Sequence, residues 1–204
     1  MPRAGPERDP SVDPRYDAAG WNLIASVLRW RRTLPHRHPS LVDLGMGRGR
    51  DSIYFARRGF RVVGYERSPL GLRRAEVRAA RYSIPLRAVR ADLRTLRLAG
   101  SYDVVFSSTA LNHLPRGIRV RRFAHFQDHT VPGGIHAVNA FVRPAPGGTP
   151  PETGVNGTLF SPHELAGYYP GWELLEDREF TFDCASPARP HRHTVDVVVA
   201  RKPR

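Results

Sequence analysis

Short apolar runs alternate with segments of helical periodicity along most of the chain. The apolar runs have the length of buried strands and are bounded by turn-forming residues. We expect strands at 40–45, 61–66, 86–91, 102–108 and 134–142, and helices at 50–58, 69–81 and 115–129. Strands and helices that alternate at this rhythm predict an α/β fold with a Rossmann-like, doubly wound sheet that is mostly parallel.

The C-terminal part of the chain departs from this alternation. After an expected helix at 161–169, two apolar runs at 172–182 and 194–202 follow each other without a helix between them. Such a pair predicts a hairpin. The hairpin would add one antiparallel strand near the C-terminus to an otherwise parallel sheet.

The N-terminal residues and one long connection also fall outside the alternation. Residues 1–13 mix proline, arginine and acidic residues without periodicity, which predicts a flexible tail. Apolar residues recur at helical spacing over 14–34, so we expect a helix that caps the sheet. The segment 143–159 is rich in proline and glycine, follows a strand and is predicted to be a lid loop. With 204 residues the chain has room for one α/β domain, which we place at 14–204.

The most informative motif lies where the first strand of the alternation meets its first helix. Residues 41–51 read LVDLGMGRGRD, with Asp43 two positions before the first of three glycines in the pattern G-x-G-x-G. Glycines at such a junction let a ligand lie against bare backbone. The dinucleotide pattern would place its third glycine one residue later, and the phosphate-loop pattern does not occur in the sequence. The loop therefore predicts a cofactor site that does not require a phosphate.

Polar residues close the next strands of the expected sheet. Glu66 ends its strand about 20 residues beyond the glycines, where a carboxylate can accept both hydroxyls of a ribose. Asp92 closes a short apolar strand and could accept a hydrogen bond from an exocyclic amino group, and Ser108 ends the fourth strand. Because the carboxyl ends of parallel strands meet at one edge of a sheet, we expect these residues to line a common site.

The ordered series of these motifs resembles the class I methyltransferases that bind S-adenosylmethionine. It covers roughly residues 38–142 and consists of D-L-G-x-G-x-G, V-V-G-Y-E, A-D-L, Y-D-V-V-F-S-S and V-P-G-G. A narrower resemblance is to the tellurite-resistance (TehB-like) methyltransferases, small one-domain enzymes taken to methylate soft nucleophiles. That similarity is carried by the segments GRGRDSIYFARRGFRV, VPGG, FSPHEL, YYPGWE and the closing ARK.

The resemblance implies S-adenosyl-L-methionine as the cofactor and assigns residues to its amino-acid end. Gly45, Met46 and Gly47 would pass beneath the methionine part, and Ser108 would touch the backbone of the amino-acid end. Arg50, at the start of a helix, would reach the cofactor carboxylate, with a solvated surface position as an equal alternative.

The resemblance also assigns residues to the nucleoside end of the cofactor. Glu66 would accept from both ribose hydroxyls, and Arg67 would flank the adenine. Asp92 and Leu93 would meet the adenine amino group and ring. Asp43 would hold the glycine loop in shape rather than touch the ligand.

The acceptor of the methyl group is the least determined part of the sequence-based interpretation. The TehB-like resemblance implies a small molecule with a soft sulfur, selenium or tellurium nucleophile, which needs no general base. An O- or N-methyltransferase of a small metabolite or natural product is the alternative, because His113 follows the fourth strand and could act as its catalytic base. A capping or packing role for His113 is equally open.

The charge of the chain raises the question of nucleic acid. The net charge is +13, and 31 of the 32 basic residues are arginine, spread over four of the five expected helices. This spread favours a solvated basic surface over a nucleic-acid patch. An RNA methyltransferase would use an Asn-Pro-Pro-Tyr type of stretch after the fourth strand, which here reads Ser107-Ser108-Thr109-Ala110. A cofactor-binding module without turnover is a further alternative, and the oligomeric state is not predicted.

Cysteine, histidine and hydropathy patterns indicate the compartment and bear on membrane spans and metal sites. The one cysteine, Cys184, excludes an internal disulfide and fits a reducing compartment. No run of about 18 apolar residues and no apolar leader occur, so we expect a cytoplasmic protein without a membrane span. The pairs His36/His38 and His191/His193 lack further ligands at metal spacing, so we expect no metal.

Overall fold

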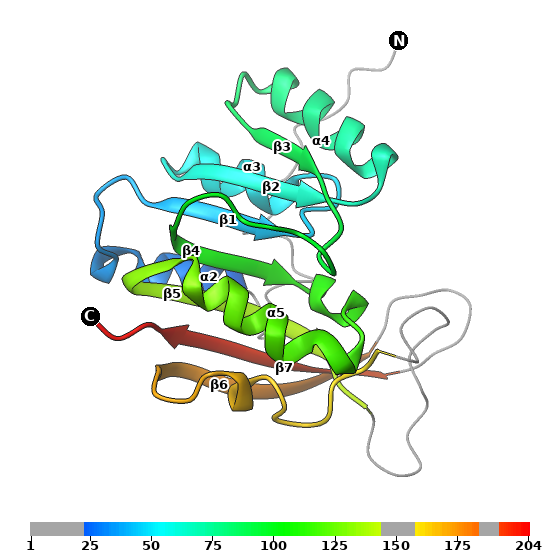
Figure 1. The fold of residues 1–204 in the computed structure, drawn as a ribbon. Coiled ribbons are helices and arrows are strands. Elements are labelled where there is room, and N and C mark those ends of the chain that lie inside the picture. The colour runs from blue at the N-terminus through cyan, green and yellow to red at the C-terminus, as the bar shows by residue number, and fades with distance from the viewer. Residues whose placement is uncertain (1–22, 144–157, 184–191) are drawn as a thin grey trace.

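The computed structural model describes residues 23–143, 158–183 and 192–204, which form a sheet of seven strands with helices on both faces (Figure 1). The strand order is β3-β2-β1-β4-β5-β7-β6. The strands are β1 (Ser40–Leu44), β2 (Arg61–Glu66), β3 (Arg87–Arg90), β4 (Tyr102–Ser108), β5 (Thr130–Phe141), β6 (Glu173–Asp183) and β7 (Arg192–Arg201). The helices are α2 (Leu23–Trp30), α3 (Arg50–Arg57), α4 (Pro69–Arg81) and α5 (Arg116–Asp128), with short 3₁₀ turns η2 (Arg31–Thr33), η3 (Ala110–His113) and η4 (Ala166–Tyr168).

The centre of the sheet is parallel and buried. β1 lies between β2 and β4, and all three run in the same direction. β4 is buried along six of its seven residues, as expected for a strand covered on both faces by helices. β7 runs antiparallel to both β5 and β6. The predicted Rossmann-like sheet, mostly parallel with one antiparallel strand near the C-terminus, is therefore confirmed.

Two apolar layers cover the faces of the sheet. On one face α2 and α3 pack through Val27 and Phe55, both of which are fully buried. On the other face α5 packs through Phe123 and Phe126. Figure 1 shows α5 crossing in front of the sheet, with α2 and α3 behind it. The helices thus leave the carboxyl ends of β1 to β4 uncovered for a site.

Two expected elements differ in the structure. β5 begins at Thr130 instead of 134, and its register with β4 shifts between the pairs Tyr102/Thr130 and Val104/Ile135. The Val-Pro-Gly-Gly segment is thus an irregularity within a strand, which is where a proline in a sheet is tolerated.

The helix expected at 161–169 is wrong, because only η4 forms there. His163 has a positive φ of 58°, which an α-helix cannot contain. The first 22 residues, the segment 144–157 and Cys184 lie outside the described residues, and with them the expected tail, the first part of the cap helix and nearly all of the expected lid.

Candidate functional site

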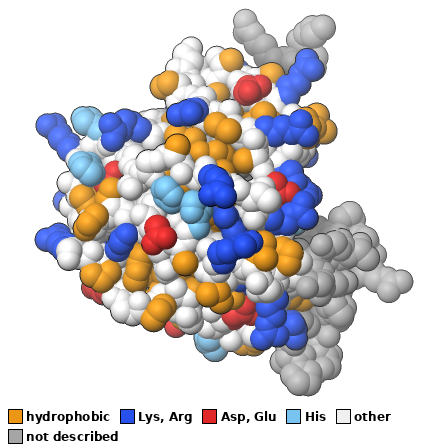
Figure 2. Space-filling view, viewed as in Figure 1, with side chains coloured by type: hydrophobic (Ala, Val, Ile, Leu, Met, Phe, Trp, Pro, Cys, Tyr) orange, Lys and Arg blue, Asp and Glu red, His pale blue; other side chains and the backbone are white. Residues whose placement is uncertain are grey.

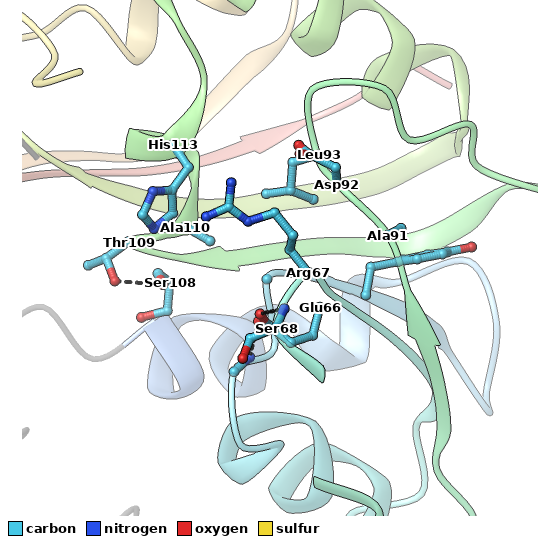
Figure 3. A pocket seen from close by; sticks show the side chains of 13 residues that line it. Glu66, Arg67, Ser68, Ala91, Asp92, Leu93, Ser108, Thr109, Ala110 and His113 are labelled. Atoms are coloured by element: carbon cyan, nitrogen blue, oxygen red, sulfur yellow. Dashed lines mark hydrogen bonds between the residues drawn. The ribbon is translucent and has the colours of Figure 1, made fainter. Parts of the chain in front are cut away.

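A cavity of about 400 Å³ opens at the carboxyl ends of β1 to β4 (Figure 3). Its size lies within the range of small-molecule sites. The lining residues are Gly45, Gly47, Tyr65, Glu66, Arg67, Ser68, Ala91, Asp92, Leu93, Ser108, Thr109, Ala110 and His113.

The glycine loop after β1 is held tightly against two neighbours. The backbone N–H groups of Gly45 and Met46 both donate to the carbonyl of Tyr65, at 2.9 and 3.0 Å. Gly45 has a φ of +87°, and a Cβ at this position would lie 2.2 Å from the Cβ of Ala110. Only glycine therefore allows β1 to end so close to η3, which carries His113.

Gly47 presents its bare backbone to the cavity. It has a φ of +56°, and a Cβ built on it would meet no atom within 4 Å. Its N–H donates to a carboxylate oxygen of Glu66 at 3.0 Å. The open space beside Gly47 is space that a ligand can fill, since Gly47 lines the cavity.

Glu66 joins the glycine loop to the end of β2. Besides the N–H of Gly47, its carboxylate accepts the N–H of Ser68 at 2.6 Å. A carboxylate has about four lone-pair sites, so two further donors can bind. Glu66 lines the cavity and is half-buried, and these free sites suit a pair of hydroxyl groups.

Asp92 lies across the cavity from the glycine loop, in the segment after β3. Both of its carboxylate oxygens accept hydrogen bonds from the guanidinium of Arg94, at 2.6 to 3.0 Å. These bonds hold the pKa of Asp92 below its usual value. Its neighbour Leu93 is buried and lines the cavity. Asp92 is thus a charged acceptor whose position Arg94 fixes.

The far wall is built where β4 runs into η3. Thr109 has a positive φ of 59°, and its N–H donates to the amide oxygen of Asn139 at 2.6 Å. The fully buried Asn112 donates to the carbonyl of Phe141 and accepts from its N–H, at 2.9 and 2.8 Å. These bonds fix the turn that carries His113 to the cavity.

His113 itself is exposed and lines the cavity. Figure 3 shows its imidazole at the rim of the cavity, above Thr109 and Ala110. Within the described part of the chain, no side chain or backbone group forms a hydrogen bond with this ring. The structure therefore brings His113 to the site without a group that orients it.

Two residues that the sequence assigned to the cofactor, Met46 and Arg50, are not among the residues that line the cavity, and neither is Asp43, which was expected to shape the loop. Asp43 is buried and accepts a hydrogen bond from Ser52 at 2.6 Å, and burial raises the pKa of Asp43 to about 8. The Met46 side chain packs toward Gly64 on β2, where a Cβ would lie 2.2 Å from its sulfur. Arg50 donates to Asp51 at 2.7 Å. Asp43 thus pins the start of α3 to β1, as expected for a residue that shapes the loop.

Five cavity residues were not singled out from the sequence: Tyr65, Ser68, Ala91, Thr109 and Ala110. The first four adjoin predicted site residues along the chain, so proximity in sequence could have indicated them. Ala110 carries no such signal, because its place depends on the positive φ of Thr109 and on contact with Gly45.

Two other histidines of the described residues serve the fold. His36 bonds to Asp103 at 2.6 Å. His136 is buried between Thr130 and Tyr169, at 2.8 and 3.0 Å, and burial lowers the pKa of His136 to about 3. No group of three or more His, Cys, Asp or Glu side chains within the described ranges is placed to hold a metal ion. His191 lies outside those ranges.

No helix among the described residues has both the length and the apolarity to cross a membrane.

Sequence comparison shows that the chain is similar to known methyltransferases and their relatives. Residues 41–134 match the model of a family described as a methyltransferase domain. The chain is 31% identical over 138 residues to Hemagglutinin 1 of Eikenella corrodens, covering 68% of this chain and 45% of that protein. It is 24% identical over 139 residues to a probable S-adenosyl-L-methionine-dependent methyltransferase TehB of Haemophilus influenzae (strain 10810), covering 68% and 48%.

A solved structure has a similar fold. The crystal structure of TehB from Haemophilus influenzae matches with a TM-score of 0.75 at 20% sequence identity, covering 89% of this chain and 61% of that one. The chain spans about half the length of the curated relatives that it matches.

Proposed function

We propose that this chain methylates a small molecule with S-adenosyl-L-methionine. The premise is that residues 41–134 belong to the methyltransferase domain family and that the fold is that of the class I, TehB-like enzymes. One observation carries the proposal. The bare backbone of Gly47 and the carboxylate of Glu66 meet in one cavity, joined by a hydrogen bond of 3.0 Å. This combination suits a ligand with a ribose and an adjoining chain that lies against backbone.

The described residues fit this cofactor. Glu66 would accept the ribose hydroxyls, and Leu93 would contact the adenine ring between Asp92 and Arg67. Gly45 and Gly47 would lie along the methionine part, with Ser108 beside its amino-acid end. When bound, S-adenosyl-L-methionine supplies an electrophilic methyl group on a sulfonium sulfur. The residues of the chain contribute alignment, which is worth up to about 7 to 11 kcal/mol for ideally held reactants.

We further propose a soft sulfur, selenium or tellurium centre as the acceptor. A lone pair of the acceptor forms the bond to the methyl carbon, while the bond from that carbon to the sulfonium sulfur breaks and its electron pair stays on sulfur. A thiolate has already lost its proton to solvent, so no side chain has to remove one. The lack of an orienting partner for His113 among the described residues supports an acceptor of this kind.

An O- or N-methyltransferase remains the alternative, and the presence of His113 in the cavity is the observation that favours it. The remaining proposals concern the whole chain: a single domain over 14–204, a lid at 143–159 and a cytoplasmic location, which the single cysteine supports. Nucleic acid stays the less favoured substrate class.

The function is tested by a methyl-transfer screen with tellurite, selenite, simple thiols, phenols and amines, read by release of S-adenosylhomocysteine. We expect turnover with the thiols or the chalcogen oxyanions. Turnover restricted to phenols or amines would replace the soft acceptor by the alternative. Cofactor binding without turnover on any acceptor would reduce the chain to a binding module.

Glu66→Ala should weaken S-adenosyl-L-methionine binding by roughly 1.5 to 3 kcal/mol, or about 10-fold to 150-fold in Kd, because a charged acceptor of two hydroxyl groups is lost. Isothermal titration calorimetry measures this change. The matched control is Glu76→Ala, which removes an exposed carboxylate from α4 and should leave Kd unchanged. Equal affinities of the two variants would show that Glu66 does not hold the ribose.

His113→Ala should lower kcat on a thiol acceptor by less than about tenfold, because only positioning is lost when no proton has to be removed. If His113 were the base for a hydroxyl or an amine acceptor, its loss would lower kcat on the order of 100-fold to 10,000-fold and remove a pH dependence of the rate. The control is His38→Ala, an exposed histidine before the amino end of β1, at the opposite end of that strand from the cavity. A large loss in His113→Ala with the cofactor still bound would identify an oxygen or nitrogen acceptor.

A further inference from the structure

Two of the four large apolar side chains that are well exposed among the described residues lie on one helix, α4. Leu70 is 57% exposed and Val77 is 63% exposed, whereas Val120 on α5 and Leu174 on β6 are each the only one on their element. Single apolar side chains at a surface are ordinary. Leu70 and Val77 are seven residues apart, which is about two helical turns, so they point to the same side of α4.

Arginines flank both apolar side chains on this side of α4. Arg73 and Arg74 lie three and four residues after Leu70, and Arg81 lies four residues after Val77. All three arginines are exposed. Arg73 and Arg74 form no hydrogen bond or ion pair with any described residue. We call Leu70, Arg73, Arg74, Val77 and Arg81 the α4 face.

The α4 face lies at the positive end of the molecule. Figure 1 shows α4 beside the edge strand β3, and Figure 2 shows basic and apolar side chains next to each other in that part of the molecule. Glu76, the one acidic residue of α4, lies about 100° around the helix from Val77. β6 forms the opposite edge of the sheet, and it contains five acidic residues and one arginine. The α4 face thus combines positive charge with apolar surface and contains no acidic side chain.

A surface of this composition fits a bilayer that contains anionic lipids. Arginines interact with the lipid phosphates at the headgroup level, and aliphatic side chains between them enter the acyl boundary. Nucleic acid would use the arginines, but single strands stack on aromatic side chains, and the α4 face has none. A second copy that met the α4 face with its own α4 face would bring arginine against arginine.

We propose that the α4 face binds the surface of a membrane that contains anionic lipids. The helix then lies in the plane of the interface and does not span the bilayer. Ser68 accepts the N–H of Gly71 at the start of α4, at 3.2 Å, and also lines the cofactor cavity. The α4 face therefore begins beside the cavity, and membrane binding keeps the cavity near the bilayer. Membrane binding of this kind does not depend on methyl transfer, so the two can fail separately.

Co-sedimentation of the full chain with vesicles measures the binding. One set of vesicles has equal parts of phosphatidylglycerol and phosphatidylcholine, and the other has phosphatidylcholine alone. At about 0.1 M salt we expect binding to the mixed vesicles to be at least about tenfold stronger, because several arginines are attracted by the anionic lipid. Raising the salt to about 0.5 M should weaken the binding, because salt screens this attraction.

The apolar part of the face is tested by replacing both of its aliphatic side chains. Leu70→Ser with Val77→Ser should weaken binding to the mixed vesicles by about tenfold, because the inserted side chains are lost. The matched control is Val120→Ser with Leu174→Ser, which removes the other two exposed apolar side chains. This control should stay within about twofold of the wild-type protein, because these residues lie away from α4.

The basic part of the face is tested by charge reversal. Arg73→Glu with Arg74→Glu should weaken binding to the mixed vesicles by at least about tenfold. Arg116→Glu with Arg121→Glu makes the same change in net charge at two exposed arginines of α5, and should weaken it by less than about threefold. The Kd of S-adenosyl-L-methionine should stay unchanged in all of these variants, because none of the substituted residues lines the cavity.

Three outcomes would overturn the proposal. The first is binding to neither kind of vesicle, or equal losses in the α4 variants and their controls. The second is tighter binding to the RNA poly(U) than to the mixed vesicles, lost in the glutamate variant of α4 and kept in the serine variant, which would assign the face to nucleic acid. The third is a dimer in sedimentation equilibrium that the serine variant of α4 dissociates, which would assign the face to a second copy. Vesicle binding without methyl transfer would leave the proposal standing.

Discussion

Gly47→Val is expected to abolish measurable binding of S-adenosyl-L-methionine while the protein stays folded. A Cβ at this position would meet no protein atom within 4 Å, so the valine side chain would extend into the cavity that Gly47 lines. The space that it fills is space that the proposed ligand needs. We expect a loss of at least about 3 kcal/mol, which is more than about 100-fold in Kd. Isothermal titration calorimetry measures the binding, and circular dichroism checks the fold.

Gly100→Val is the control for the backbone strain that a valine causes at position 47. Gly100 also has a positive φ, +81°, and open space around its Cβ position, but it lies outside the cavity. Both variants carry the cost of a β-branched residue in the left-handed region, so any shared loss of stability cancels. We expect Gly100→Val to bind the cofactor normally. Normal binding by Gly47→Val as well would show that the loop does not hold the ligand.

Arg119→Leu should destabilise the fold by about 3 to 5 kcal/mol, the cost of breaking a buried ion pair by removing one partner. The Arg119 side chain is 1% exposed and stacks on the ring of Phe160 at 3.6 Å from its centroid. It donates to the carbonyl of Leu114 at 3.1 Å and to Glu164 at 2.8 Å. Leucine would keep some packing but remove the donor of the Leu114 carbonyl and one of the hydrogen bonds that Glu164 accepts. Urea unfolding should show a lower midpoint with an unchanged m value.

The matched control is Arg116→Leu on the same helix, where the arginine is exposed and forms no hydrogen bond with the described residues. Its change in unfolding free energy should stay within about 0.5 kcal/mol, as for other surface substitutions. A similar small effect in Arg119→Leu would mean that the contacts of Arg119 add nothing beyond its packing. The pKa of Glu164 independently reflects the hydrogen bond from Arg119. Burial acts to raise its pKa, but the hydrogen bonds from Tyr168, Ser161 and Arg119 outweigh burial and keep the pKa of Glu164 below its usual value.

Much of the sheet could be predicted from local pattern. The strands at 61–66 and 102–108 and the helix at 69–81 have the predicted bounds, and four other strands and helices of the parallel part differ by one or two residues. Each of these elements has a periodicity that its own residues set, because a helix or a strand buries one face or both against its neighbours. The exceptions are the start of β5 and the expected helix at 161–169. At the first place the register with β4 decides the backbone, and at the second the positive φ of His163 excludes an α-helix.

The candidate site shows the same division. The sequence by itself determined the glycine loop and the acidic residue that ends β2, since glycine content and strand ends are local properties of the chain. Only the tertiary structure decided which residues face the cavity. It turns Met46 toward Gly64 and brings Ala110 against Gly45. It binds Asp92 to Arg94 and brings the charge of Arg67 close enough to act on the same carboxylate. Side-chain direction at a loop depends on the packing of segments that are distant in sequence, and no periodicity records that packing.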